Sequence, residues 1–150
     1  MPDKPIRVLV VCTHNSARSQ MAEALLRRIG GERFEVYSAG TEATRVHPLA
    51  VRAMADVGID ISDARSKHLD EFIADRFDYV ITVCDRARET CPVFPGEPQR
   101  IHWSFPDPAA VEGTEEERLR AFRRVRDELT QRLRVWITAV TSARRASPSI

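Results

Sequence analysis

The 150-residue sequence has no long apolar run and almost no net charge. None of its apolar segments approaches the roughly 20 residues that a helix needs to cross a bilayer. Lys and Arg number 23 against 22 Asp and Glu, a net charge of +1, whereas proteins that bind nucleic acids or anionic membranes have a clear basic excess. We therefore expect no nucleic acid and no membrane as partners. The N-terminal stretch MPDKPIRVLVVC lacks the apolar region and cleavage site of a signal peptide, which favours a cytoplasmic protein.

The sequence has few cysteines, and it lacks the glycine-rich motifs that bind phosphate. Cys12, Cys84 and Cys91 are the three cysteines, and they cannot all pair within one chain. A reducing compartment disfavours structural disulfides, and free cysteine packs as a small hydrophobe, so three scattered buried thiols are the simplest interpretation. Neither G-x-G-x-x-G nor G-x-x-x-x-G-K-[ST] occurs. The spacing of Cys84 and Cys91 is not that of zinc ligands, and no metal is expected.

What is present is an alternation of strand and helix patterns. Apolar runs predict strands at 6–11, 33–40 and 77–84, with a short one at 100–103, and helical periodicity covers 19–29, 48–57, 69–75 and 119–140. This order predicts an α/β fold: a three-layer α/β/α arrangement with a four-stranded parallel sheet. We expect residues 1–141 to form a single domain and 142–150 to be an irregular tail, and we expect a monomer.

The loop after the first strand carries the chemistry. Its residues 13–19, called the oxyanion loop below, are Thr13, His14, Asn15, Ser16, Ala17, Arg18 and Ser19. A tight loop that runs into a helix start points backbone N–H groups inward, which makes a concave site for a tetrahedral oxyanion. Arg18 can bind two of its oxygens. The same field favours a thiolate at Cys12, beneath the anion, as a nucleophile.

Other loop residues have supporting roles in this interpretation. Ser16 and Ser19 are candidates to donate hydrogen bonds to the thiolate, and Asn15 is expected to brace the loop from within. His14 either modulates the field or has no role. Ligands of parallel sheets bind beyond the C-terminal strand ends, where Cys12 and Cys84 both fall. We therefore expect these two cysteines to be close in space.

The stretch CTHNSARSQMAE (12–23) closely resembles the signature loop of low-molecular-weight tyrosine phosphatases and of the arsenate reductases built on that fold. The resemblance continues through YSAG (37–40), GIDIS (58–62), VITVCDRARETCP (80–92) and HWSFPDPA (102–109). The later matches are similar to the arsenate reductases rather than the phosphatases. The resemblance implies a low-molecular-weight-phosphatase-like fold that binds arsenate, with phosphate or sulfate as mimics.

The same resemblance implies a reaction scheme. Cys12 attacks arsenate, and Asp107, in the Asp107-Pro108 pair, stands at the position of the family's general acid. Cys84 then attacks Cys12 and releases arsenite, and Cys91 attacks Cys84. The resulting disulfide is reduced by a thioredoxin-type partner, so no bound cofactor is needed. A glutaredoxin or mycothiol relay stays open as the electron source.

The scheme requires Cys84 and Cys91, at the two ends of residues 84–91, to come close enough to form a disulfide. In a regular helix the two cysteines would lie about 10.5 Å apart along the axis, whereas a disulfide needs Cα atoms within roughly 7 Å. The segment is therefore looped, or it unwinds on oxidation. Its interior, DRARET, is polar, so opening exposes little apolar surface. We predict a local rearrangement of about residues 84–96 that brings the disulfide to the surface.

Two other functions compete with this one. A phosphatase acting on phosphotyrosine or a small phosphoester would use Cys12, Arg18 and Asp107 but would leave the other cysteines without a role. Ala109 also stands where many such phosphatases have an aromatic residue. The third alternative is a non-catalytic oxyanion-binding or redox-sensing domain.

A cation site is a further question raised by the resemblance. Some relatives bind potassium through side chains that match Asn15, Glu23 and Ser38, and the downstream part of that site here contains Arg65 and Lys67. The ammonium of Lys67 either lies near Glu23 and stands in for the cation, or simply faces solvent. Both interpretations stay open at this point.

Overall fold

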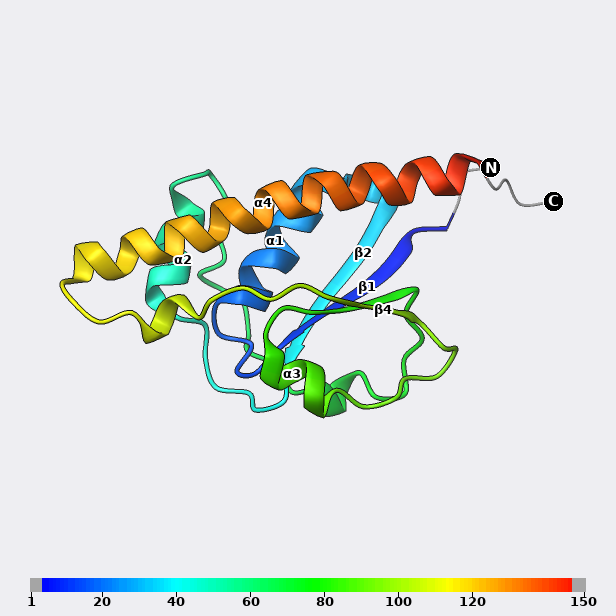
Figure 1. Ribbon diagram of the computed structural model, residues 1–150, viewed down its shortest axis with the longest axis horizontal. Coiled ribbons are helices and arrows are strands. Elements are labelled where there is room, and N and C mark those ends of the chain that lie inside the picture. Colours follow the sequence, from blue (N-terminus) through cyan, green and yellow to red (C-terminus); the bar gives the residue numbers. More distant parts are fainter. Residues whose placement is uncertain (1–3, 147–150) are drawn as a thin grey trace.

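The computed structural model describes residues 4–146, which fold around a parallel four-stranded sheet with the order β2-β1-β3-β4 (Figure 1). The strands are β1 (Ile6–Cys12), β2 (Phe34–Gly40), β3 (Tyr79–Thr82) and β4 (Gln99–His102). The helices are α1 (Arg18–Gly30), α2 (Pro48–Ala55), α3 (Asp85–Thr90) and α4 (Glu115–Ala146), with short 3-10 helices η1 (Gly31–Arg33), η2 (Leu69–Glu71) and η3 (Pro108–Ala110). The predicted four-stranded parallel sheet is confirmed.

Strand β1 lies inside the sheet, as its uninterrupted apolar run predicts. It pairs with β2 from Ile6 opposite Phe34 to Cys12 opposite Gly40, and with β3 along its other edge. After β1 the chain adds β2 on one side and later returns to add β3 on the other. Ligands of open parallel sheets bind at such a change of direction, beyond the carboxyl ends of the strands. Cys12 ends β1 at this position.

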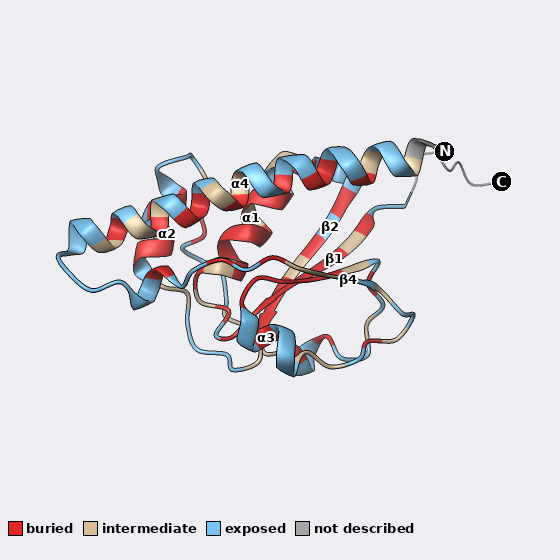
Figure 2. Cartoon of the chain, viewed as in Figure 1, coloured by how far each residue is buried: buried red, intermediate tan, exposed pale blue. Residues whose placement is uncertain are grey.

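The two faces of the sheet are covered unequally. Helices α1 and α4 pack together on one face, where Trp136 of α4 contacts the rings of Phe34, Tyr79 and Trp103 at centroid distances of 5.7, 5.1 and 6.0 Å. Figure 2 shows the resulting buried stripe along α4. Buried residues predominate in β1, β2 and β3, but none occurs in β4. The opposite face carries an aromatic cluster supplied by β2 and by irregular segments: Tyr37, Phe72, Phe77 and Phe94. The outer layer on that face is therefore the thinner one.

Some elements differ from the sequence-based expectation. The predicted helix at 69–75 is reduced to η2, and the polar segment after Cys84 forms α3. Helix α4 begins at Glu115, where Thr114 and Glu117 form a reciprocal capping box. It continues to Ala146, past position 142, where an irregular tail was expected. Arg144 donates to the backbone carbonyl of Lys4 and ties the last turns to the start of the chain. The rest of the predicted tail, 147–150, lies outside the described residues.

Within residues 4–146, no helix is both long enough and apolar enough to span a membrane.

Candidate oxyanion and thiol site

The oxyanion loop curls around the sulfur of Cys12. The backbone N–H of Asn15 donates to Cys12 Sγ at 3.2 Å, and Ser19 Oγ lies 2.7 Å from the same sulfur. Cys12 is buried, and Asn15 turns the loop with a φ of 49°, a conformation that asparagine adopts more readily than most residues. Hydrogen bonds of this kind stabilise a thiolate.

The start of helix α1 leaves room for an anion. Ala17 stands at the N-cap, where it provides no side-chain hydrogen bond, and the first turn holds no acidic residue. The first N–H groups of a helix have no partner within the helix, and they lie at the positive end of its dipole. Without a competing cap, they remain available to a bound oxyanion. Loop and helix together therefore form a cradle above Cys12.

Asn15 holds the loop in shape. Its amide nitrogen donates to Ser19 Oγ at 2.8 Å and to Ser38 Oγ at 2.9 Å. Its amide oxygen accepts from Gln20 Nε2 and from the backbone N–H of Lys67, both at 2.8 Å. The loop is thereby fixed to α1, to β2 and to the segment after α2, which is the bracing role expected for Asn15.

Gly40, at the end of β2, allows the loop to sit this close to the sheet. A Cβ atom at this position would lie 2.6 Å from the backbone oxygen of Thr13 and 2.7 Å from the backbone nitrogen of Asn15. Gly40 ends the predicted strand 33–40 with no role predicted for it, and Gln20 lies within the motif 12–23 without a predicted role. The sequence does contain one hint of the role of Gly40: a glycine stands at the end of a strand predicted to lie beside the loop.

The two serines and His14 have different surroundings. Ser19 lies against the sulfur of Cys12, whereas the backbone carbonyl of Ser16 accepts from the N–H of His47, which caps α2. His14 Nε2 lies 3.3 Å from Glu42 Oε2 with both side chains about half exposed. Ser19 is thus the serine placed to stabilise a thiolate, and His14 faces outward.

Arg18 and Asp107 meet beside the loop. Arg18 Nη1 donates to the backbone oxygen of Phe105 at 3.1 Å, and its Nη2 lies 3.9 Å from Asp107 Oδ2. The Arg18 side chain is 13% exposed and that of Asp107 41%. The other Asp107 oxygen accepts from the N–H of Ala109, which caps η3. The segment after β4 thus brings a partly exposed carboxyl group next to the guanidinium.

Cys84 lies against the same loop. It follows β3, is buried, and its Sγ is 3.3 Å from Thr13 Oγ1. Two cysteines 72 positions apart in the sequence are thus brought to neighbouring strand ends, as expected from the topology. The structure has all three cysteines as free thiols.

Cys91 stands at the far end of α3. Cys84 is the N-cap of this helix and Cys91 its C-cap, so the whole of α3 lies between them; seven residues of regular helix span about 10.5 Å. Burial raises the pKa of the Cys91 thiol, and the nearby charge of Arg100 acts in the opposite direction. Of the two alternatives for this segment, the structure shows a helix, which must unwind before a Cys84–Cys91 disulfide can form.

Lys67 points into the protein. Its Nζ lies 3.1 Å from Glu23 Oε1, and its side chain is 15% exposed. Ser38 donates to the same oxygen at 2.6 Å, while Arg27 Nη1 lies 3.1 Å from the other oxygen of Glu23. Arg65 turns away and pairs with Glu71. Because two cationic side chains already surround the Glu23 carboxylate, the donor set does not fit a bound potassium ion.

The chain belongs to the low molecular weight phosphotyrosine protein phosphatase family, whose sequence model matches residues 7–146. Within that family its relatives include arsenate reductases. The arsenate reductase of Halalkalibacterium halodurans is 46% identical over 129 residues, which cover 86% of this chain and 93% of that protein.

Solved structures similar to this chain also include arsenate reductases. An arsenate reductase in its oxidized state superposes with a TM-score of 0.76 at 34% identity, over 89% of this chain and 98% of the other. The thioredoxin-dependent arsenate reductase of Corynebacterium glutamicum superposes with a TM-score of 0.73 at 31% identity, over 96% of this chain and 66% of the other.

Proposed function

We propose that this protein is an arsenate reductase in which Cys12, Cys84 and Cys91 pass electrons in sequence to the arsenic atom. The observation that carries the proposal is the position of Cys84, whose sulfur touches the oxyanion loop through Thr13. A phosphatase needs one cysteine, an arginine and an acid, and has no use for a second buried thiol at this place. An enzyme that reduces arsenate must supply two electrons, and a pair of thiols supplies them by forming a disulfide.

The first step uses the cradle. Arsenate has the shape and charge of phosphate, so the N–H groups at the start of α1 and the Arg18 guanidinium bind its oxygens. The Cys12 thiolate attacks arsenic, a sulfur–arsenic bond forms, and an arsenic–oxygen bond breaks. Asp107 protonates the departing oxygen, which leaves as water. Ser19 and the N–H of Asn15 hold the thiolate in position before the attack.

The next steps move two electrons onto arsenic. The Cys84 thiolate attacks Cys12 Sγ, the sulfur–arsenic bond breaks, and its electron pair leaves with arsenic as arsenite. Cys91 then attacks Cys84 as a thiolate and releases Cys12 as a thiolate. A dithiol of the thioredoxin class reduces the Cys84–Cys91 disulfide. The Corynebacterium glutamicum relative is a thioredoxin-dependent arsenate reductase, and a glutaredoxin or mycothiol relay is the alternative electron source.

The state of the cysteines indicates the cellular compartment in which the protein acts. Three free cysteines that must cycle between thiol and disulfide need a reducing compartment. We therefore place the protein in the cytoplasm, acting as a monomer with a thiol-based protein partner and no bound cofactor.

The cradle also supports phosphoester hydrolysis as a side reaction, because arsenate and phosphate bind in the same way. Cys12, Arg18 and Asp107 suffice for it. Ala109 provides no aromatic surface for a phosphotyrosine ring, so we expect weak activity toward small aryl phosphates and none specific for phosphotyrosine.

Replacement of single cysteines separates the two activities. Cys84→Ser and Cys91→Ser should each abolish multiple-turnover arsenate reduction, followed as arsenate-dependent NADPH consumption with thioredoxin and thioredoxin reductase. Both variants should keep aryl phosphate hydrolysis within about twofold of the wild type, because the cradle is intact. Sustained arsenate reduction by either variant would overturn the proposal, as would a wild-type protein that consumes no NADPH.

A further inference from the structure

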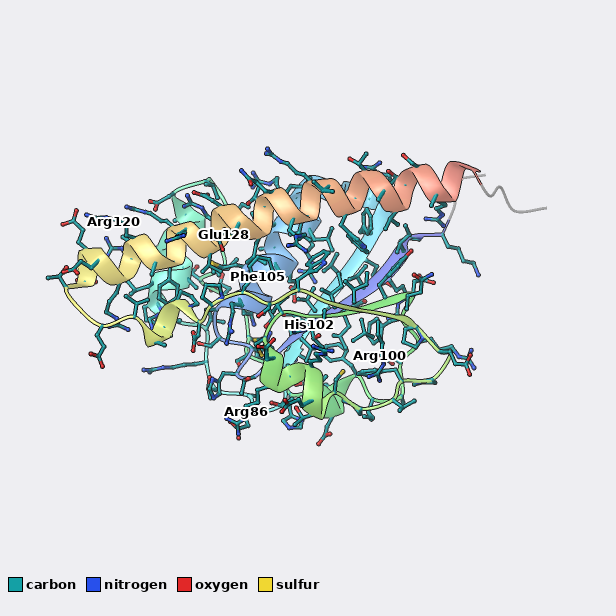
Figure 3. All side chains as sticks on the ribbon, in the orientation of Figure 1. Arg86, Arg100, His102, Phe105, Arg120 and Glu128 are labelled. Carbon is teal, nitrogen blue, oxygen red and sulfur yellow. The ribbon has the colours of Figure 1, made fainter. Side chains whose placement is uncertain are left out.

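Both ends of α3 are tied to the same strand. His102, the last residue of β4, has its Nε2 2.8 Å from Asp85 Oδ1, and Asp85 directly follows Cys84. Arg100, two residues earlier on β4, donates from its guanidinium to the backbone carbonyl of Pro92, which directly follows Cys91. Residues i and i+2 of a strand point to the same face, so both side chains leave β4 on one side (Figure 3).

Strand β4 is itself well fixed. It pairs with β3 over its whole length, and Thr82 Oγ1 on β3 lies 2.7 Å from His102 Nδ1. His102 therefore bridges β3 and α3 through its two ring nitrogens. Its side chain is 19% exposed, whereas that of Asp85 is 74% exposed. The redox segment, residues 84–96, is thus attached to an edge strand that is paired with β3 along its whole length.

These ties oppose the movement that the relay requires. A Cys84–Cys91 disulfide needs the two Cα atoms within roughly 7 Å, but α3 holds the cysteines about 10.5 Å apart along its axis. Both ties hold an end of α3 at its present place on β4. Bringing the two cysteines together therefore strains or breaks at least one of them.

We propose that Arg100 and His102, here called the β4 clasp, are positioning residues that hold the redox segment in its dithiol conformation. The clasp sets the equilibrium between the dithiol and the Cys84–Cys91 disulfide. This inference rests on the proposed function, because it assigns a purpose to the movement of α3. Neither residue touches the arsenic atom or the oxyanion loop in the scheme above.

The charges around the clasp agree with this role. The hydrogen bond from His102, followed by that from Ser104, lowers the pKa of Asp85, so its carboxylate is ionised at neutral pH. Arg88 on α3 acts in the same direction. At the other end, the charge of Arg100 opposes the effect of burial on the Cys91 thiol. A third contact of α3, Arg86 with Glu42 at 3.7 Å, joins two side chains that are both more than half exposed.

The test is the redox equilibrium of the cysteine pair. A Cys12→Ser protein leaves Cys84 and Cys91 as its only thiols, and its dithiol–disulfide equilibrium is measured against dithiothreitol by alkylation and mass spectrometry. In this background, Arg100→Met and His102→Leu should each shift the equilibrium constant toward the disulfide by about two- to fivefold, the range of partly exposed polar pairs. Arg100→Lys should restore the original value, because an ammonium can also reach the Pro92 carbonyl.

Arg120→Met is the matched control, since Arg120 is an exposed arginine on α4, away from the clasp (Figure 3). Its equilibrium constant should equal that of the parent protein. With Cys12 restored, the clasp variants should keep aryl phosphate hydrolysis, which shows that the cradle is folded. If both clasp variants match the Arg120→Met control, or if Arg100→Lys behaves like Arg100→Met, the proposal is wrong.

Failure of the proposed function gives a different result. In that case wild-type protein treated with arsenate forms no Cys84–Cys91 disulfide. The clasp experiment uses dithiothreitol and no arsenate, so its outcome is read independently of the reductase activity.

Discussion

In the proposed reaction, Asp107 protonates the oxygen that leaves arsenic. One of its oxygens lies 3.9 Å from Arg18, and the other is fixed by the N–H of Ala109. We expect Asp107→Asn to lower kcat for arsenate reduction by about 10²- to 10⁴-fold, the usual contribution of a general acid. The exposed Asp63 supplies a control, and Asp63→Asn should leave kcat unchanged. A raised KM at constant kcat in Asp107→Asn would instead assign a binding role.

Lys67 provides a second prediction, because its ammonium occupies the place of a cation beside Glu23. Wild-type activity should be the same in potassium and sodium chloride at equal ionic strength. Lys67→Met leaves Glu23 with fewer partners and should lower the free energy of unfolding by about 1–3 kcal/mol in urea titrations. Arg65→Met, which breaks an exposed pair with Glu71, should lower the free energy of unfolding much less than Lys67→Met does. Activity that rises severalfold with potassium would contradict this account.

The sequence indicated the loop but not the residues that support it from elsewhere. Cys12 and Arg18 share one short motif, so their proximity follows from local geometry. Gly40 matters because the backbone of Thr13 approaches it closely, and Gln20 matters because it reaches Asn15. Contacts of this kind depend on how β2 and α1 are placed around the loop, which no local pattern encodes.

Helix α3 should control the pH dependence of the last thiol exchange. Burial raises the pKa of Cys91 above the ordinary thiol value, so the thiol is mainly protonated at neutral pH. Attack on Cys84 requires the thiolate, whose fraction grows about tenfold per pH unit below the pKa. Conversion of the Cys12–Cys84 disulfide into Cys84–Cys91 should therefore accelerate steeply between about pH 7 and pH 8.5. Acid quenching, alkylation and peptide mass spectrometry measure this rate, and a flat profile would contradict the assignment.

The movement of α3 is itself open to measurement. Amide NMR spectra of the reduced and the Cys84–Cys91-oxidised protein should differ across residues 84–96 and agree over α1 and the middle of α4. Helix α3 itself is polar apart from the buried Ala87, so unwinding its six residues exposes little apolar surface. Superimposable spectra over 84–96 would show that the helix does not rearrange.

Among the elements, periodicity predicted best where burial is continuous. Strand β1 and helices α1 and α4 have long apolar patterns, and all three are present. Helix α3 has six residues with one buried side chain, so its sequence carries no stripe that could reveal it. The apolar positions of α4 stop near Val140 and so predict an earlier end, but the helix runs to Ala146, with Arg144 donating to the Lys4 carbonyl.

The stability of the whole fold depends on the packing of α4 against the sheet. Trp136 contacts rings on β2, on β3 and in the segment after β4, so its loss should destabilise the entire fold. We expect Trp136→Ala to lower the free energy of unfolding by about 3–5 kcal/mol in urea titrations. Its neighbour Val135 is 70% exposed, and Val135→Ala should change stability by less than about 0.5 kcal/mol. If both variants lost the same free energy of unfolding, the packing of Trp136 would not be central to the stability of the fold.

The fold gathers thiols from distant parts of the sequence at one edge of a parallel sheet. The strand order explains why Cys12 and Cys84 are neighbours. In the proposed relay, α3 keeps Cys91 away from Cys84 until the helix unwinds. The direct test is a single turnover of the Cys91→Ser protein with arsenate, analysed by non-reducing peptide mass spectrometry. We predict one Cys12–Cys84 disulfide for each arsenite released. Arsenite release without that disulfide, or no arsenite at all, would contradict the relay.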